Sequence, residues 1–325
     1  MTPDPRAPRP QQRRRVSRRR YQLRRAVALG VVAAVGLAVV GGARALLGSD
    51  GGDIASATSA PLPAQDLVGA AGTTLAAPGG TTMPSTAPPP TMQPEAVGPP
   101  TAANPATMLI AGDSDAGAFG PYLTSLMDDT GIVRTELDYK VSSGLARPDF
   151  FDWPAHLSQV LPAVDPDIVV MTLGGNDSQG LAIGDGTFIA QSPTGDAADD
   201  AEWRAEYGRR VGAVMDQLLA DGRTLVWVGI PNDDNDDVTI RLRVQDEVAK
   251  AEAAKRPEVV FVDTWNIFSG KEGGWAEYHV DPRDGQGKKV RASDGFHLNT
   301  VGAEILALEI SGAVQQALRD RGAVL

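Results

Sequence analysis

The sequence of 325 residues contains no cysteine. This absence excludes a disulfide framework, a zinc site built from thiolates and a cysteine nucleophile. It does not identify a compartment, because a chain without cysteine is compatible with oxidising and reducing surroundings alike. The length allows one large domain or two ordinary ones, either of which can bury a proper core.

Positive charge is scarce in the C-terminal two thirds of the chain. Residues 106–325 carry 36 acidic and 19 basic side chains. Because binding to phosphates needs clustered positive charge, this balance argues against a domain that binds nucleic acid. Residues 1–25 have the opposite character, with ten arginines and one acid. Arginine also outnumbers lysine 24 to 6 in the whole chain, which is typical of a GC-rich bacterial genome.

Residues 26–43 (AVALGVVAAVGLAVVGGA) form the longest uncharged apolar run. As a helix they span about 27 Å, close to the hydrocarbon thickness of a bilayer. The arginines ahead of the run predict a cytoplasmic N-terminus, and hence a single-pass anchor in a bacterial cell membrane with the rest of the chain extracytoplasmic. Two alternatives stay open: a signal peptide cleaved near Ala43-Arg44-Ala45, and a basic tail that binds nucleic acid.

Residues 44–105 read as a linker between this anchor and the rest of the chain. Residues 48–105 contain eleven prolines but no aromatic residue, lysine or arginine. Such a composition buries too little apolar surface to offset the entropy of ordering, so we expect a disordered, solvated spacer. Its threonines and serines also permit O-glycosylation.

Apolar runs and helical patterns alternate from residue 106 to the end of the chain, which we expect to form one domain. The expected strands are 108–111, 167–173, 224–230 and 258–263. One expected helix follows the first strand and ends near Met127, and three more span 201–220, 238–255 and 300–318. Strands that are apolar throughout and separated by helices predict an α/β fold, a three-layer α/β/α sandwich around a mostly parallel, flavodoxin-like sheet. Residues 178–200 and 271–291 show little periodicity and read as loops.

Polar residues follow the ends of two expected strands, where ligands bind in parallel sheets. Ser114 follows the first strand in the motif Gly-Asp-Ser, and Asn176 follows the second in Gly-Gly-Asn-Asp. Taken alone, Ser114 is better explained as an ordinary helix cap, and Asn176 is open to the same explanation. His297 is one of three histidines, and Asp294 precedes it by three residues. This spacing lets the carboxylate hold the imidazole in one tautomer, so that its other nitrogen accepts a proton; a capping aspartate beside a surface histidine is the alternative.

Taken together, these blocks and Gly144 resemble the SGNH (GDSL-type) hydrolase superfamily, named for its Ser, Gly, Asn and His. The segments SSGLARPDFFDWP (142–154), TLGGND (172–177) and VRASDGFHLN (290–299) are similar to a bacterial branch catalogued as a domain of unknown function. The resemblance covers residues 107–318.

The resemblance implies that Ser114 is the nucleophile, His297 the base and Asp294 the group that orients it. It also implies an oxyanion hole made by the backbone N–H groups of Ser114 and Gly144 and the side-chain amide of Asn176. No cofactor and no metal ion are implied.

Asp115 departs from the pattern, because the superfamily usually has an aliphatic residue directly after the serine. A carboxylate there raises the cost of negative charge at the site, or else points to solvent. Candidate contacts to a polar substrate are Asp115, Asp149 and Trp153, with helix capping an equal alternative for Asp149. His156, close in sequence to Phe150 and Phe151, reads as structural or pocket-lining.

These observations predict a membrane-anchored, extracytoplasmic serine esterase or O-acyltransferase. Its expected substrates are acyl esters, acetyl esters first among them, of cell-envelope glycans or glycolipids. Two alternatives remain: a catalytically silent SGNH-like domain that binds envelope polysaccharide or a partner protein, and a lipase or thioesterase. The sequence lacks the Gly-x-Ser-x-Gly elbow of α/β-hydrolases and any P-loop.

Overall fold

The computed structural model describes residues 98–325. The predicted cytoplasmic tail (1–25), the anchor (26–43) and most of the linker (44–105) lie outside these residues. Within the described part, no helix has the length and apolar character needed to span a membrane.

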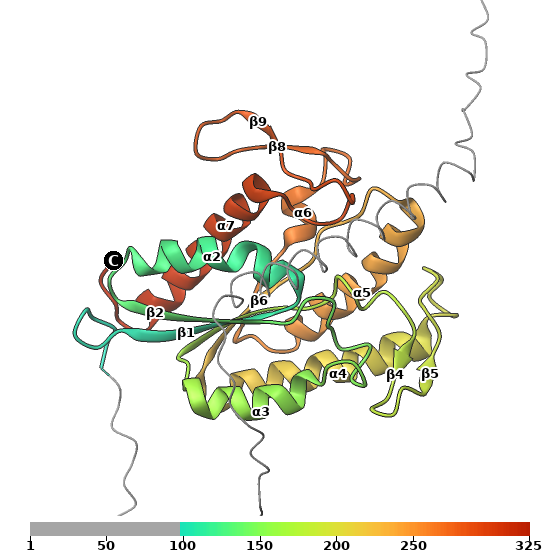
Figure 1. Cartoon of the computed structure of the whole chain (residues 1–325), viewed down its shortest axis with the longest axis horizontal. Coiled ribbons are helices and arrows are strands. Elements are labelled where there is room, and N and C mark those ends of the chain that lie inside the picture. The colour runs from blue at the N-terminus through green and yellow to red at the C-terminus, as the bar shows by residue number, and fades with distance from the viewer. Residues whose placement is uncertain (1–97) are drawn as a thin grey trace, which may run out of the picture. The chain divides into compact units, whose positions relative to one another are not determined.

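Five parallel strands form the central sheet (Figure 1). They are β1 (Ala106–Gly112), β2 (Val133–Tyr139), β3 (Ile168–Thr172), β6 (Thr224–Val228) and β7 (Val259–Val262). Their spatial order is β2-β1-β3-β6-β7, which is the flavodoxin-like order. The predicted α/β class and the parallel sheet are therefore confirmed.

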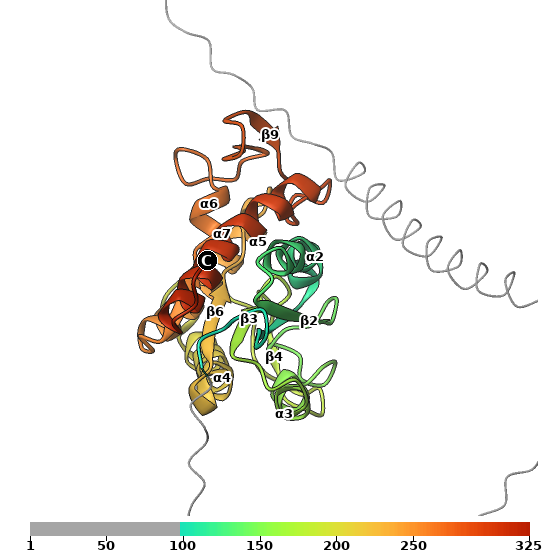
Figure 2. The ribbon, with the colours of Figure 1, turned by 90° about the vertical axis from the view of Figure 1, so that its left-hand side faces the viewer.

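Helices cover both faces of the sheet, which gives the three predicted layers (Figures 1 and 2). One face packs against α2 (Ser114–Asp128) and α7 (Thr300–Asp320). The other packs against α3 (Trp153–Val164), α4 (Ala201–Leu219) and α5 (Asp236–Ala254). The short α6 (Thr264–Phe268) follows β7, and the 3-10 turn η1 (Ala220–Gly222) leads into β6.

Alternation along β1 divides the core in two. Met108 and Ile110 face the layer of α2 and α7, whereas Leu109 and Ala111 face the layer of α3, α4 and α5, and all four side chains are fully buried. A strand buried on both faces must be apolar at every position, which is why β1 and β3 are visible in the sequence as continuous apolar runs.

Two segments predicted as loops contain short antiparallel hairpins. Residues 178–200 include β4 (Leu181–Ala182) paired with β5 (Phe188–Ala190), and residues 271–291 include β8 (Tyr278–Val280) paired with β9 (Gly287–Lys289). Strands of two or three residues are too short for a period-2 pattern to appear, so the sequence did not indicate them.

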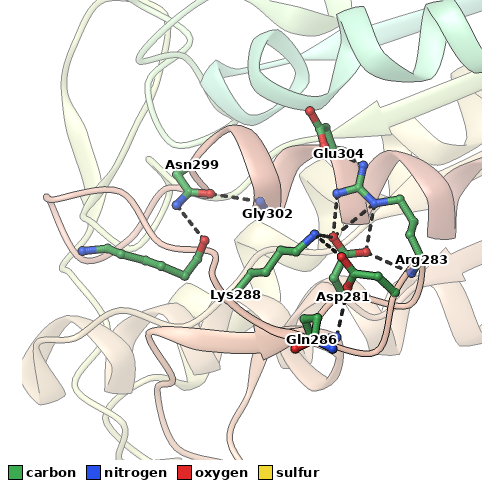
Figure 3. A network of polar contacts seen from close by, with 9 residues as sticks. Asp281, Arg283, Gln286, Lys288, Asn299, Gly302 and Glu304 are labelled. Atoms are coloured by element: carbon green, nitrogen blue, oxygen red, sulfur yellow. Dashed lines mark hydrogen bonds and ion pairs between the residues drawn. The ribbon is translucent and has the colours of Figure 1, made fainter.

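The β8–β9 hairpin is fixed to α7 through one buried carboxylate (Figure 3). Asp281 is fully buried and accepts hydrogen bonds from the Arg283 guanidinium and from Lys288 Nζ at 2.8 Å. Arg283 Nη1 in turn reaches Glu304 of α7 at 2.6 Å. These donors hold the pKa of Asp281 well below its usual range. The hairpin thus has a defined position on the domain although its strands are short.

Candidate active site

Two strand ends meet at the point where the strand order reverses. The chain leaves β1 for β2 on one side and later returns to β3 on the other. Ser114 is the first residue of α2, directly after β1, and the 174–177 turn directly follows β3. Crevices at such switch points bind ligands in α/β sheets, so the topology brings the serine and Asn176 to the same edge.

Ser114, His297 and Asp294 form a continuous hydrogen-bonded series. Ser114 Oγ lies 2.9 Å from His297 Nε2, and His297 Nδ1 lies 2.7 Å from Asp294 Oδ2. The side chains of His297 and Asp294 are 36% and 52% exposed, so the series is open to solvent. Burial alone would raise the pKa of Asp294, but the hydrogen bonds from His297 outweigh it and leave that pKa below its usual value.

The backbone of the loop that carries the imidazole is held by hydrogen bonds with two side chains. Asp294 Oδ1 accepts the backbone N–H groups of Phe296 and His297, both at 3.1 Å. Trp275 Nε1 donates to the Gly295 carbonyl at 2.7 Å. Gly295 has φ +91°, and a Cβ on it would lie 2.2 Å from Asp234 Oδ1, so only glycine fits this turn.

Arg291 supports the same loop from inside the protein. Its guanidinium donates to the carbonyls of Phe296 and Asn232, both at 2.9 Å, and to Asn232 Oδ1 at 2.6 Å. The residue is 1% exposed, and burial lowers its pKa to about 10. The motif VRASDGFHLN alone does not indicate this role for Arg291, because Asn232 and Phe268, which accept its hydrogen bonds, are distant in the sequence.

Asn176 and Gly144 also lie next to one another. Asn176 Nδ2 donates to the Ser143 carbonyl at 3.0 Å, and its second contact, to Asp113 Oδ2, is long at 3.5 Å. Within residues 98–325, no hydrogen bond uses the backbone N–H of Gly144 or that of Ser114. Through its two contacts, Asn176 lies between Ser143, which precedes Gly144, and Asp113, which precedes Ser114.

A buried network behind Gly144 sets the position of its loop. Asp177 accepts the backbone N–H groups of Leu145 and Ala146 at 2.9 and 2.8 Å. Tyr207 of α4 donates its hydroxyl to the same carboxylate at 2.8 Å and accepts from Gln245 of α5 at 3.0 Å. The sequence does not indicate this network, because Tyr207 is spaced like the apolar residues of α4 and this spacing predicts only burial.

Asp113 and Asp115 are buried acids on either side of the serine. Asp113 is fully buried and caps α2 by accepting the Asp115 N–H at 3.0 Å. Burial, then the nearby charge of Asp115, raises the pKa of Asp113 well above its usual value. Asp115 is 6% exposed. Of the two alternatives given for this carboxylate, the one in which it points to solvent is therefore wrong, and its buried Oδ2 offers a substrate no contact.

The two other predicted substrate contacts have different outcomes. Trp153 is fully buried, and its Nε1 donates to Ser143 Oγ at 2.9 Å, so it braces the Gly144 loop and has no surface for a substrate. Asp149 forms a two-pronged pair with Arg147 at 2.6 and 2.8 Å near the surface, and its role stays a prediction. His156 pairs with Asp138 at 2.6 Å and packs on Phe151, which fits the structural reading.

Residues 98–325 contain no group of three or more carboxylate or imidazole side chains placed to hold a metal ion. Around Ser114, the structure shows a hydroxyl beside one nitrogen of an imidazole and a carboxylate beside the other, groups that acyl transfer can use.

Comparison with known proteins gives a family match. The family described as "Protein of unknown function (DUF459)" matches residues 107–313. No curated protein matches the chain.

Several solved structures are similar in fold. Axe2, an acetylxylan esterase from Geobacillus stearothermophilus, is 15% identical with a TM-score of 0.45, over 70% of this chain and 97% of that one. A GDSL-like lipase from Bacteroides thetaiotaomicron is 12% identical with a TM-score of 0.43, over 65% of this chain and 89% of the lipase. The psychrotrophic esterase EstA from a Pseudoalteromonas species is 11% identical with a TM-score of 0.42, over 66% of this chain and 99% of the esterase.

Proposed function

The chain belongs to the DUF459 family, a branch with SGNH-type motifs as the sequence analysis predicted, and we propose that it is a serine esterase or O-acyltransferase. The observation that carries this proposal is the Ser114–His297–Asp294 series with its two short contacts. A serine hydroxyl is a weak nucleophile until an adjacent base accepts its proton, and the imidazole is placed to do so.

The first half of the reaction forms an acyl-enzyme. Ser114 Oγ attacks the ester carbonyl carbon while its proton moves to His297 Nε2, and Asp294 stabilises the resulting imidazolium through Nδ1. The negative charge that develops on the carbonyl oxygen is met by the N–H groups of Ser114, Gly144 and Asn176. When the tetrahedral intermediate collapses, the ester C–O bond breaks and His297 gives the proton to the departing alcohol.

The second half repeats these steps with a new nucleophile. His297 accepts a proton from water or from a sugar hydroxyl, which attacks the acyl carbon. The bond from that carbon to Ser114 Oγ then breaks, and His297 returns the proton to Oγ. Water gives hydrolysis and a hydroxyl gives acyl transfer. Both outcomes use the same residues.

We propose acyl esters of cell-envelope glycans or glycolipids as the substrates, with acetyl as the acyl group. The support is the predicted membrane anchor with its long spacer, which would hold the domain outside the cell and near the envelope. The solvent exposure of His297 and Asp294 suits a bulky substrate that presents its ester from outside.

The test is hydrolysis of p-nitrophenyl acetate by the purified full-length chain. We expect Ser114→Ala to lower kcat at least 100-fold with no change in circular dichroism. Ser125→Ala is the matched control, because Ser125 lies exposed on the same helix. Equal activity of Ser114→Ala and the wild type would refute the proposal.

An acyl-chain series separates the remaining alternatives. Falling kcat/KM from acetate to longer esters supports the proposed acyl group, and rising values would favour a lipase or thioesterase instead. Wild-type protein without activity on any ester, yet with measurable binding to envelope polysaccharide, would favour the catalytically silent domain.

A further inference from the structure

The loop that carries His297 is a narrow hairpin with a buried arginine at its base. Arg291 and Leu298 face each other in an antiparallel bridge, and the His297 carbonyl accepts the N–H of Ala292 at 2.8 Å. These contacts define the shape of the 291–298 hairpin. They do not fix how the hairpin lies against the rest of the domain, so its attachment has to come from elsewhere.

The guanidinium of Arg291 joins this hairpin to three other segments. Within the hairpin it donates to the Phe296 carbonyl at 2.9 Å. It reaches the carbonyl and the side-chain oxygen of Asn232, which follows β6, at 2.9 and 2.6 Å. It also donates to the carbonyls of Phe268, at the end of α6, at 3.2 Å and of Ala276, before β8, at 3.3 Å. One side chain thus ties the hairpin to the ends of β6 and α6 and to the start of the β8–β9 hairpin.

Arginine suits this arrangement better than any other side chain. Its planar guanidinium presents five N–H groups in a fixed fork, whereas lysine has one ammonium group on a flexible chain. Arg291 is 1% exposed, and the oxygens that accept its hydrogen bonds are all neutral. Burying a charge among neutral partners is costly, and apolar side chains of similar volume often fill such a space at lower cost. The presence of an arginine therefore indicates a role in fixing one arrangement of these segments.

We propose that Arg291 is a positioning residue that acts through His297: it fixes the 291–298 hairpin and thereby sets the distance from His297 Nε2 to Ser114 Oγ. The Phe296 carbonyl that it binds belongs to the peptide bond leading into His297. The distance that it sets is 2.9 Å, and misplacement of a reacting group by about 1 Å can lower a rate about 100-fold. The catalytic meaning of this inference rests on the proposed function, whereas the attachment of the hairpin can be measured in the resting protein.

Steady-state kinetics of Arg291→Lys on p-nitrophenyl acetate, in the full-length chain, test the effect on catalysis. The change keeps the positive charge and removes the fork, so we expect kcat to fall about 100-fold with little change in KM. Arg321→Lys is the matched control, because Arg321 donates to the carbonyls of Asp167 and Gly222 at 2.7 and 3.1 Å. These residues precede β3 and β6, at the opposite edge of the sheet from Ser114. We expect the control to keep its kcat.

Urea unfolding of the two variants separates positioning from stability. Both lose hydrogen bonds from an arginine to backbone carbonyls, so both should lose unfolding free energy, but the proposal predicts a loss of kcat in Arg291→Lys alone. Equal kcat losses in the two variants, or none in either, would overturn it. Asn232→Ala covers the case in which Arg291→Lys does not fold, because it removes only the acceptor at 2.6 Å. We expect a smaller fall in its kcat, and a folded Asn232→Ala with the kcat of the wild type would contradict the proposal.

Hydrogen exchange of one indole proton gives a readout that does not depend on catalysis. Trp275 Nε1 donates to the carbonyl of Gly295 in the 291–298 hairpin at 2.7 Å. In NMR spectra of the full-length chain, we expect this proton to exchange about 10-fold faster in Arg291→Lys, because the hairpin opens more often. A Trp275→Phe variant assigns the signal. Trp153 and Trp203 are internal controls, since their Nε1 groups donate to acceptors outside the hairpin.

The two readouts keep this inference separate from the proposed function. Faster exchange of Trp275 in Arg291→Lys, in a protein whose wild type has no esterase activity, would retain the attachment of the hairpin and refute the function. An active wild type whose Arg291→Lys variant keeps both its kcat and the slow exchange would do the reverse. Loss of kcat without faster exchange, or faster exchange without loss of kcat, would also overturn the inference, because the position of the hairpin would then not set the activity.

Discussion

The carboxylate of Asp177 fills the space that a side chain at position 144 would need. A Cβ on Gly144 would lie 2.1 Å from Asp177 Oδ1. The same carboxylate accepts the next two backbone N–H groups, those of Leu145 and Ala146. The glycine is therefore required by the packing of one buried acid, which also fixes the position of the two residues that follow it.

Gly144→Ala should lower kcat on p-nitrophenyl acetate about 100-fold, because the methyl group displaces Asp177 and with it the N–H donor. Gly184→Ala is the control, since a Cβ on Gly184 would meet nothing within 4 Å. We expect the control to keep wild-type activity. A fully active Gly144→Ala variant would show that the donor is not used.

Asn176→Ala should lower kcat about 10²–10³-fold with little change in KM, because the loss of an oxyanion donor raises the energy of the transition state and leaves that of the bound ester unchanged. Steady-state kinetics on p-nitrophenyl acetate separate the two parameters. A variant with raised KM and normal kcat would instead place Asn176 in ground-state binding.

Tyr207→Phe tests the network behind the loop. The change removes a donor to Asp177 and an acceptor for Gln245, both buried, and should cost about 1–3 kcal/mol of unfolding free energy. Urea unfolding measures it. Tyr122→Phe is the control, since no hydrogen bond within residues 98–325 uses the Tyr122 hydroxyl. Equal stabilities of the two variants would contradict the network.

Stability should also depend on pH through Asp246. This residue is 3% exposed, and burial raises its pKa to about 6 despite Lys250 Nζ at 2.8 Å. The native state binds this proton more tightly than the unfolded chain does. The protonated carboxyl therefore adds to the free energy of unfolding below about pH 4, and this stabilisation is lost as the pH rises to about 6. A pKa raised from 3.8 to about 6 corresponds to about 3 kcal/mol of unfolding free energy.

Urea unfolding at pH 4 and pH 7.5 checks this sign. From pH 4 to pH 7.5, the unfolding free energy of the wild type should fall by about 3 kcal/mol relative to that of Asp246→Asn, whose amide does not titrate. Asp216→Asn is a control of opposite sign, because Arg256 lowers the pKa of Asp216 and its contribution is lost on acidification. A pH-independent difference between wild type and Asp246→Asn would contradict the prediction.

The sequence predicted the strands that are buried on both faces and the long helices, but it did not identify β2 or α3. Strand β2 lies at the edge of the sheet and reads VRTELDY, with exposed charged residues that hide an apolar pattern. Helix α3 contains Pro154 and Pro162, which usually interrupt helices, yet Pro154 stands in the first turn where proline is tolerated.

The residues expected at the site could be found because each follows a strand end or precedes the last helix in a recognisable block. Their support could not be found this way. Asp177, Tyr207 and Gln245 come from three distant segments and are joined through buried hydrogen bonds. Only the packing of α4 and α5 against the sheet reveals them. Trp153 was misjudged for the same reason, since sequence shows an aromatic residue but not its burial.

The central claim is that His297 activates Ser114 as a nucleophile, and covalent labelling tests it most directly. The full-length chain is treated with a fluorophosphonate and its peptides are analysed by mass spectrometry. We predict a single adduct on Ser114 that is lost in His297→Ala. An unlabelled Ser114, under conditions that fully label a known serine hydrolase in the same tube, would contradict the account.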